Sequence, residues 1–200
     1  HGLLERIRDL NLTLISVSRS SRSTQEPKKG GLYVKTLVLS YSFTDNNQKL
    51  AASLAAALGA EHVQITEPKP RKMATIVLDI VFNRTPKIVV PIEAVRDAEW
   101  VLFCGPVWMG QVATPFRACF KQLGHEIAQY AFVSICGGAD GPNPKLRGEL
   151  ERRLGKEPAC LIDLHIADLL PSEPEPTRQD TMAYRITESD VKRLTDTVVA

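Results

Sequence analysis

The chain has 200 residues, 44% of them apolar and 24% charged, which is the composition of one globular domain with its own hydrophobic core. It lacks an apolar run near the roughly 20 residues that span a bilayer and the three-part pattern of a signal peptide, so we expect a cytoplasmic protein. The net charge of +2 comes from residues 1–33, which hold six Lys/Arg and three Asp/Glu. The rest of the chain has 19 Lys/Arg and 20 Asp/Glu, so its net charge is −1. We therefore predict neither a nucleic-acid nor a membrane partner.

Residues 1–33 differ from the rest of the chain in their polar composition and end in the stretch SRSSRSTQEPKKGG. We interpret them as a leader that is either disordered or not native, and we place one domain at residues 34–200. From Val34 onward, short β-branched runs alternate with longer amphipathic segments, a rhythm that indicates a parallel sheet. The predicted strands are residues 34–40, 61–66, 99–105, 130–136 and 159–166. Most are apolar throughout, which is typical of strands covered on both faces.

The segments between the strands carry helix signals. In residues 46–59 leucines recur at a spacing of four, and Gly59 supplies a stop. Residues 114–124 offer Thr114 as N-cap with a proline behind it, and residues 143–155 repeat this scheme with Asn143. A T-x-x-D capping pattern starts the last helix at Thr187.

Two segments are less regular. Residues 72–83 fit a helix by spacing and a strand by β-branching, and we predict a helix because the crossover from the second to the third strand needs one. Residues 168–186 contain three prolines, and we expect a long surface loop there.

Ligands of doubly wound sheets bind outside the carboxyl ends of the strands, so the loops that follow the strands are the candidate site. The loop after the first strand holds Ser42 and Thr44, whose hydroxyls can both face one phosphate at a helix N-terminus. The alternative interpretation is that Thr44 or Asp45 only caps the helix. Trp108, in the turn after the third strand, offers a flat apolar face beside this loop, which suits a phosphorylated planar cofactor; it can also simply cap the core.

Other familiar sites are missing. There is no G-x-G-x-x-G after a strand, no G-x-x-x-x-G-K-S/T and no G-x-S-x-G, so a usual dinucleotide site, a P-loop and an α/β-hydrolase elbow are excluded. The histidines at 62, 125 and 165 are far apart in sequence, and we predict no metal site and no catalytic side chain. The cysteines form no C-x-x-C pair, and we interpret them as small buried side chains, with a reactive thiol at Cys104 or Cys136 as the second interpretation.

Two of these loops resemble those of the flavodoxin family. The family pattern S/T-x-T-G-x-T after the first strand aligns with residues 42–47, and the pattern G-x-P-V/I-W/Y-x-G is close to CGPVWMG at 104–110. Asp45 stands where the family has glycine and Asn47 where it has its last threonine. Aspartate tolerates left-handed backbone, but its carboxylate repels a phosphate and must turn to water or cap the helix. Asn47 can donate an amide hydrogen.

The resemblance implies a flavodoxin-like three-layer αβα sandwich whose five-stranded parallel sheet has the order 2-1-3-4-5, and it implies FMN as cofactor. The phosphate would lie on the 42–47 loop, Trp108 would stack on the isoalloxazine, and the turns after the third and fourth strands would lie near the ring. The implied binding residues are Ser42, Phe43, Thr44, Asp45, Asn46, Asn47, Pro106, Val107, Trp108, Met109, Gly110, Gly137, Gly138 and Asp140.

Three functions are compatible with this pattern. The first is an electron-transfer flavoprotein that exchanges electrons with a redox partner protein. The second is an FMN-dependent NAD(P)H:quinone-type oxidoreductase, in which the 168–186 loop helps to cover a small-molecule pocket. The third is a flavodoxin-fold binding module without a cofactor, which the changes at Asp45 and Asn47 would favour.

Overall fold

The computed structural model describes residues 35–69, 71–139 and 141–200, so the predicted leader at 1–33 and Asp140 lie outside the described residues. Five strands form a parallel sheet in the order β2-β1-β3-β6-β7, and the pairs are in register along their length. This is the flavodoxin-like order predicted for the five strands. Their bounds are β1 Thr36–Ser40, β2 Glu61–Gln64, β3 Trp100–Cys104, β6 Gln129–Cys136 and β7 Cys160–His165.

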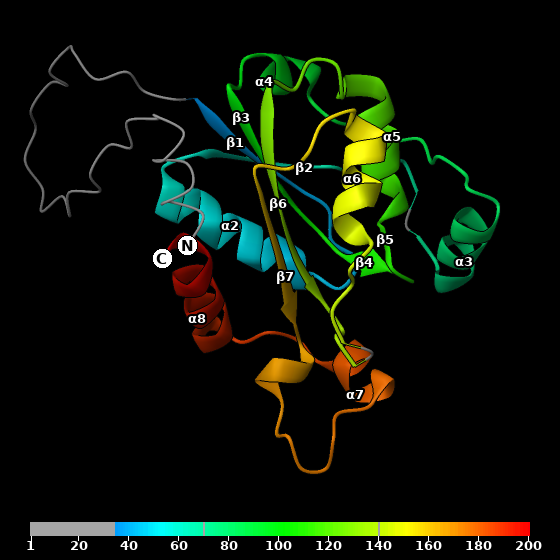
Figure 1. Ribbon diagram of the computed structural model, residues 1–200, viewed down its shortest axis with the longest axis vertical. Coiled ribbons are helices and arrows are strands. Elements are labelled where there is room, and N and C mark those ends of the chain that lie inside the picture. Colours follow the sequence, from blue (N-terminus) through cyan, green and yellow to red (C-terminus); the bar gives the residue numbers. More distant parts are fainter. Residues whose placement is uncertain (1–34, 70, 140) are drawn as a thin grey trace, which may run out of the picture.

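Helices cover both faces of the sheet, as Figure 1 shows. Side chains alternate between the faces along a strand, so Leu37 and Leu39 of β1 enter one core and Val38 enters the other. The first core lies under α5 (Thr114–Leu123) and α6 (Leu146–Leu154), and the second lies under α2 (Asn46–Leu58) and α8 (Glu188–Val199). The two cores explain why the strand sequences are apolar throughout.

Helix ends follow the sequence signals in part. Gly59 ends α2 in the left-handed region (φ 61°), and Thr187 and Asp190 form the predicted capping box of α8. The predicted N-caps of α5 and α6 were wrong. Ala113, whose carbonyl accepts from the Phe116 N–H, is the N-cap of α5, so Thr114 is its first residue. The Asn143 side-chain oxygen accepts from the Lys145 N–H in the turn before α6, and Lys145 is the N-cap of that helix.

The segment 168–186 is not the long loop that its prolines indicated. It contains a short 3-10 helix, η1 (Ala167–Leu169), and the helix α7 (Arg178–Ala183). Thr177 accepts from the Asp180 N–H and Asp180 accepts from the Thr177 N–H, so a capping box starts α7. The T-x-x-D pattern that marks α8 is thus also present here, after the last proline of the segment.

Between β2 and β3 the chain forms α3 (Met73–Val81), as predicted for residues 72–83, and the short helix α4 (Ile92–Arg96). A two-stranded antiparallel ribbon of β4 (Val107–Trp108) and β5 (Gln111–Val112) precedes α5. Among the described residues, no helix is long and apolar enough to cross a membrane.

Candidate functional site

The loop after β1 leads directly into α2 at the carboxyl edge of the sheet, the lower end in Figure 1. The Ser42 hydroxyl oxygen is buried there and has no hydrogen-bond partner in the described part of the chain. Asp45 is the N-cap of α2 and takes the left-handed conformation (φ 66°, ψ −11°), but its side chain makes no capping bond. The first N–H groups of this helix, which have no intrahelical acceptor, are therefore left without a side-chain cap.

Asn46 and Asn47 are each only 2% exposed, and their side chains hold the start of α2 in place. The Asn47 amide donates to the Ile135 carbonyl (2.9 Å) and its oxygen accepts from the Ile135 N–H (3.0 Å), which ties α2 to the end of β6. Asn46 makes the same kind of pair with Tyr184 O and Ile186 N, both at 3.1 Å. At these two positions the backbone N–H, rather than the side chain, is the group left for an anion.

The loop after β3 is the β4-β5 ribbon, whose turn at Met109 and Gly110 has positive φ at both residues (48° and 76°). Such a turn matches the twist of paired strands and places the half-buried Trp108 beside the first loop. The Trp108 ring meets those of Tyr41 and Phe43 edge-on, with centroid distances of 5.9 and 6.3 Å. The two loops predicted to share a ligand are therefore in contact.

A charged cluster that the sequence did not reveal lies against Trp108. The Arg71 guanidinium lies over the indole at 5.9 Å and forms ion pairs with Glu67 and with Asp79, the latter at 2.7 Å. The Tyr41 hydroxyl donates to Glu67 (3.0 Å), and burial together with the Glu67 charge raises the pKa of Tyr41. The sequence hint for this cluster was that Arg71 follows Glu67 by four residues. That spacing predicts an ion pair only within a helix, and these two residues lie in a loop.

The loop after β6 contains Gly137 and Gly138 and packs against the C-terminal third of the chain. A Cβ on Gly138, where φ is 77°, would lie 2.3 Å from the Cβ of His165, and one on Gly137 would lie 3.0 Å from the Thr181 hydroxyl. Only glycine fits at Gly138. Further along this segment, Asn143 donates to the Gly110 carbonyl (2.7 Å), so the third loop also contacts the second.

The arrangement fits a phosphorylated cofactor at its phosphate end. The buried Ser42 hydroxyl has no partner and can donate a hydrogen bond, and the uncapped helix N-terminus favours an anion; a phosphate can accept from both without any lysine or arginine. The ring end is more crowded. Since Arg71 covers one face of Trp108, a planar group must use the other face or displace the guanidinium.

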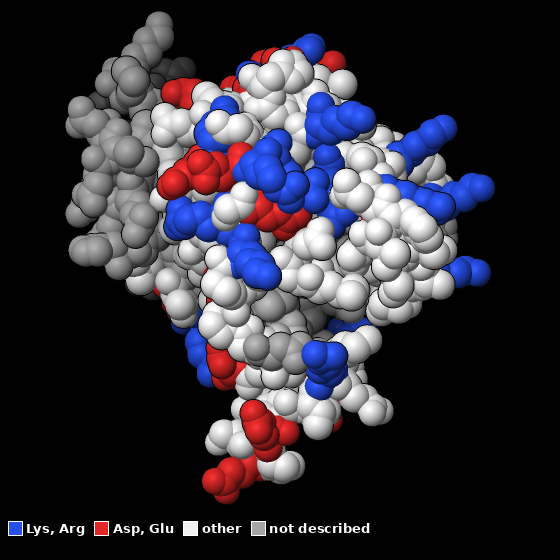
Figure 2. Space-filling view, turned by 45° about the vertical axis from the view of Figure 1, so that its right-hand side comes forward, with Lys and Arg blue, Asp and Glu red and all other residues white. Residues whose placement is uncertain are grey.

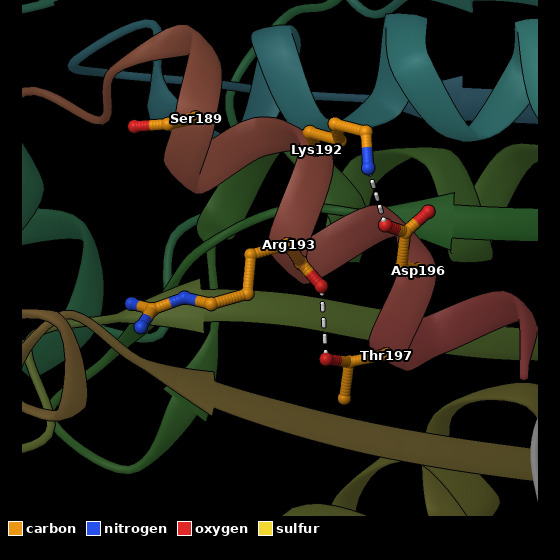
Figure 3. A pocket seen from close by; sticks show the side chains of 5 residues that line it. All are labelled: Ser189, Lys192, Arg193, Asp196 and Thr197. Atoms are coloured by element: carbon orange, nitrogen blue, oxygen red, sulfur yellow. Dashed lines mark hydrogen bonds and ion pairs between the residues drawn. The ribbon is translucent and has the colours of Figure 1, made fainter.

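A separate surface hollow of about 470 Å³ lies along one face of α8 (Figure 3). Its lining residues are Ser189, Lys192, Arg193, Asp196 and Thr197. Lys192 pairs with Asp196 at 3.1 Å, and Thr197 donates to the Arg193 carbonyl at 2.9 Å. These are ordinary contacts between neighbouring turns of an exposed helix, so we do not assign a function to this hollow.

Comparison with solved structures establishes the class of fold. A flavoprotein from Lactobacillus acidophilus NCFM in complex with FMN superposes with a TM-score of 0.57, at 20% identity, over 66% of this chain and 93% of that one. Its apo-form gives 0.54, at 19% identity, over 69% and 97%. A protein from Bacteroides eggerthii DSM 20697 gives 0.58, at 15% identity, over 83% and 98%. The chain has a flavodoxin-like fold, the one that the Lactobacillus flavoprotein uses.

No protein-family model matches the chain, and no curated protein has a significantly similar sequence.

Proposed function

We propose that this chain binds FMN and takes part in electron transfer. The observation that supports this most directly is the buried Ser42 hydroxyl without a partner, next to the uncapped N-terminus of α2. The Lactobacillus acidophilus flavoprotein, which has the same fold, was solved in complex with FMN, and this agrees with a phosphate as the anion. The proposal extends to the binding residues expected from the sequence, of which Asp140 lies outside the described residues.

In the proposed site, Ser42 and Thr44 donate hydroxyl hydrogens to the phosphate, and the backbone N–H groups of residues 45–47 supply the remaining donors. Asp45 is exposed, so its carboxylate can point to water. Trp108 and the turns at 106–110 and 137–138 border the ring. When bound, FMN supplies one- and two-electron redox chemistry, and the protein positions the ring and limits access of water.

The second candidate, an FMN-dependent NAD(P)H:quinone-type oxidoreductase, is favoured by one observation. The segment with η1 and α7 lies against the site loops: Thr181 contacts Gly137, and the Tyr184 carbonyl accepts from Asn46. Such a segment can help to enclose a small substrate. On the face shown in Figure 2, Lys and Arg side chains are mixed with Asp and Glu, so this face is not the uniformly acidic surface expected of a carrier for basic partners.

The test is a titration of the flavin-free protein with FMN, followed by flavin fluorescence, together with the visible spectrum of the purified protein. We expect saturable quenching that Ser42→Ala and Trp108→Ala weaken, whereas Ser189→Ala, on the exposed face of α8, leaves it unchanged. A protein that leaves FMN fluorescence unchanged at every concentration would overturn the proposal and favour the binding-module hypothesis.

A second measurement separates carrier from reductase. The FMN-loaded protein is mixed anaerobically with NADH or NADPH, and flavin bleaching is followed. A carrier leaves the flavin oxidised until a reduced partner protein is added, whereas a reductase bleaches at once and turns over when a quinone is supplied.

A further inference from the structure

Cys136, Asp163 and His165 come together where β6 and β7 end, beside the third loop. Cys136 is the register partner of His165, and Ser134 is the partner of Asp163, so strand pairing places the three side chains on neighbouring positions. One ligand atom from each residue lies within 4.8 Å of the other two. A thiol, an imidazole and a carboxylate are the donors that Zn²⁺ uses in proteins.

Two distances between these groups are close to those between neighbouring ligands of a tetrahedral ion, although they end on different oxygens of Asp163. With Zn–S of about 2.3 Å and Zn–N or Zn–O of about 2.0–2.1 Å, adjacent ligands are separated by about 3.6 Å for S···O and about 3.4 Å for N···O. The Cys136 sulfur lies 3.6 Å from one oxygen of Asp163, and the His165 Nε2 lies 3.4 Å from the other. A shared ion therefore needs either both carboxylate oxygens as ligands or a shift of the side chains that brings one oxygen to both Sγ and Nε2.

Two of these atoms lack a partner although they are buried. Asp163 Oδ2 and His165 Nε2 face each other, but neither makes a hydrogen bond with any described residue. Their side chains are 16% and 13% exposed, so water replaces the missing bonds poorly. The second oxygen of Asp163 accepts a hydrogen bond from Ser134, and the exposed carboxylate of Asp168 lies 3.8 Å from His165 Nδ1. Metal sites commonly hold their ligands by such outer contacts.

We propose that Cys136, Asp163 and His165 bind Zn²⁺, or a transition-metal ion of similar preference, with water at a fourth position. The soft thiolate and the imidazole disfavour Mg²⁺ and Ca²⁺, which prefer oxygen ligands. Binding replaces the proton of the Cys136 thiol, whose pKa burial and Asp163 raise to about 12. The Gly138 backbone, packed on His165, covers the site from the loop side.

The competing explanation is an ion pair between Asp163 and a protonated His165, which needs no metal. The two explanations differ in the role of Cys136. In the ion pair the thiol takes no part, whereas in the metal site it is a ligand, so only the metal site predicts that replacing Cys136 weakens metal binding. None of the three proposed ligands belongs to the proposed flavin-binding set, but Gly138 of that set packs on His165, so zinc binding is measured both without and with FMN.

The experiment is a titration of the tag-free, chelator-treated full chain with Zn²⁺ against a chromophoric chelator, with Co²⁺ as a spectroscopic probe. It is run without FMN and, where FMN binds, also with it. We expect one ion per chain by native mass spectrometry and a thiolate-to-cobalt charge-transfer band. Cys136→Ser should abolish the band, and His165→Asn and Asp163→Asn should weaken binding by more than about tenfold. Cys119→Ala and His125→Asn, which alter a thiol and an imidazole elsewhere, should change neither.

Several outcomes would overturn the proposal. They are no Zn²⁺ binding by the wild-type chain, Co²⁺ binding without a thiolate band, or tight binding that survives Cys136→Ser. The wild-type cobalt spectrum decides even where a variant does not fold, and circular dichroism identifies such variants. Zinc binding without FMN binding would support the metal site and overturn the proposed function. FMN binding without zinc binding would support the proposed function and overturn the metal site.

Discussion

Replacing Asp45 tests the proposed phosphate site most sharply, because two separate penalties meet at this residue. Its backbone is left-handed (φ 66°), and its carboxylate lies at the helix end where the phosphate is proposed to bind. The side chain is exposed, so water screens its charge, and at separations of several ångströms its repulsion of a phosphate amounts to about 1 kcal/mol. Asp45→Gly and Asp45→Asn should therefore both tighten FMN binding, by about fivefold.

The two variants differ in their effect on folding. Glycine removes the left-handed strain, about 1 kcal/mol for an L residue, but makes the unfolded chain more flexible, so the free energy of unfolding should change by less than about 1 kcal/mol. Asparagine keeps the conformation and removes only the charge. FMN fluorescence titrations at low and high salt, combined with urea unfolding, separate the contributions. The affinity gain should shrink at high salt because the charges are screened.

The reasoning fails if Asp45→Asn binds FMN no more tightly than the wild type at low salt. It fails equally if the gain is the same at high salt, since a salt-independent change cannot be charge repulsion across water. Asp97→Asn, an exposed aspartate of an ion pair at the opposite end of β3, is the matched control and should leave the affinity unchanged.

Three further changes test the scaffold. Asn47→Ala removes two hydrogen bonds to the buried backbone of Ile135 and should lower the free energy of unfolding by about 2–3 kcal/mol in urea denaturation. Gly138→Ala should destabilise clearly more than Gly141→Ala in thermal melts, because both glycines have φ near 78° but only the first has an atom within 4 Å of the added methyl. Burial lowers the pKa of His62 below 6.5, so its contribution to stability is present above that pH and is lost as the pH falls. His62→Asn should therefore flatten the pH dependence of the free energy of unfolding in urea below pH 6.5. An unchanged slope would contradict this assignment.

The sheet was predictable because its strands are buried on both faces and therefore read as continuous apolar runs. The helix ends were less so, because a cap depends on contacts outside the helix. The Asn143 amide donates to Gly110 of the β4-β5 ribbon, and its side-chain oxygen accepts from the Lys145 N–H, so it holds the turn before α6 while Lys145 is the N-cap. In residues 168–186, three prolines outweighed a T-x-x-D pattern that in fact starts α7. Capping and turn preferences show which residues can start a helix, but contacts with the rest of the fold determine which of them does.

The sequence predicted which loops lie at the candidate site, but it did not predict which side chains from other segments contact those loops. Position after a strand places Ser42 and Trp108 at the carboxyl edge by topology alone. Arg71 reaches Trp108 from a segment between β2 and α3 whose path the sequence does not specify. Asp163 and His165 stand two apart in a strand, a spacing that puts them on one face, yet their meeting with Cys136 depends on the register between β6 and β7.

The structure gives a physical reason for the departure from the flavodoxin pattern at Asn47. A threonine at this position can offer only its hydroxyl, whereas the asparagine amide spans the N–H and the carbonyl of Ile135 and joins α2 to β6. The Asn47 side chain is used to hold α2 in place, and the N–H groups at the start of that helix are the ones proposed to face the phosphate. If phosphate binds as proposed, through Ser42, Thr44 and the backbone, Ser42→Ala should reduce FMN affinity by more than Asn47→Ala does at equal folded fraction. The opposite order would place the phosphate on the Asn47 side chain and away from the buried hydroxyl.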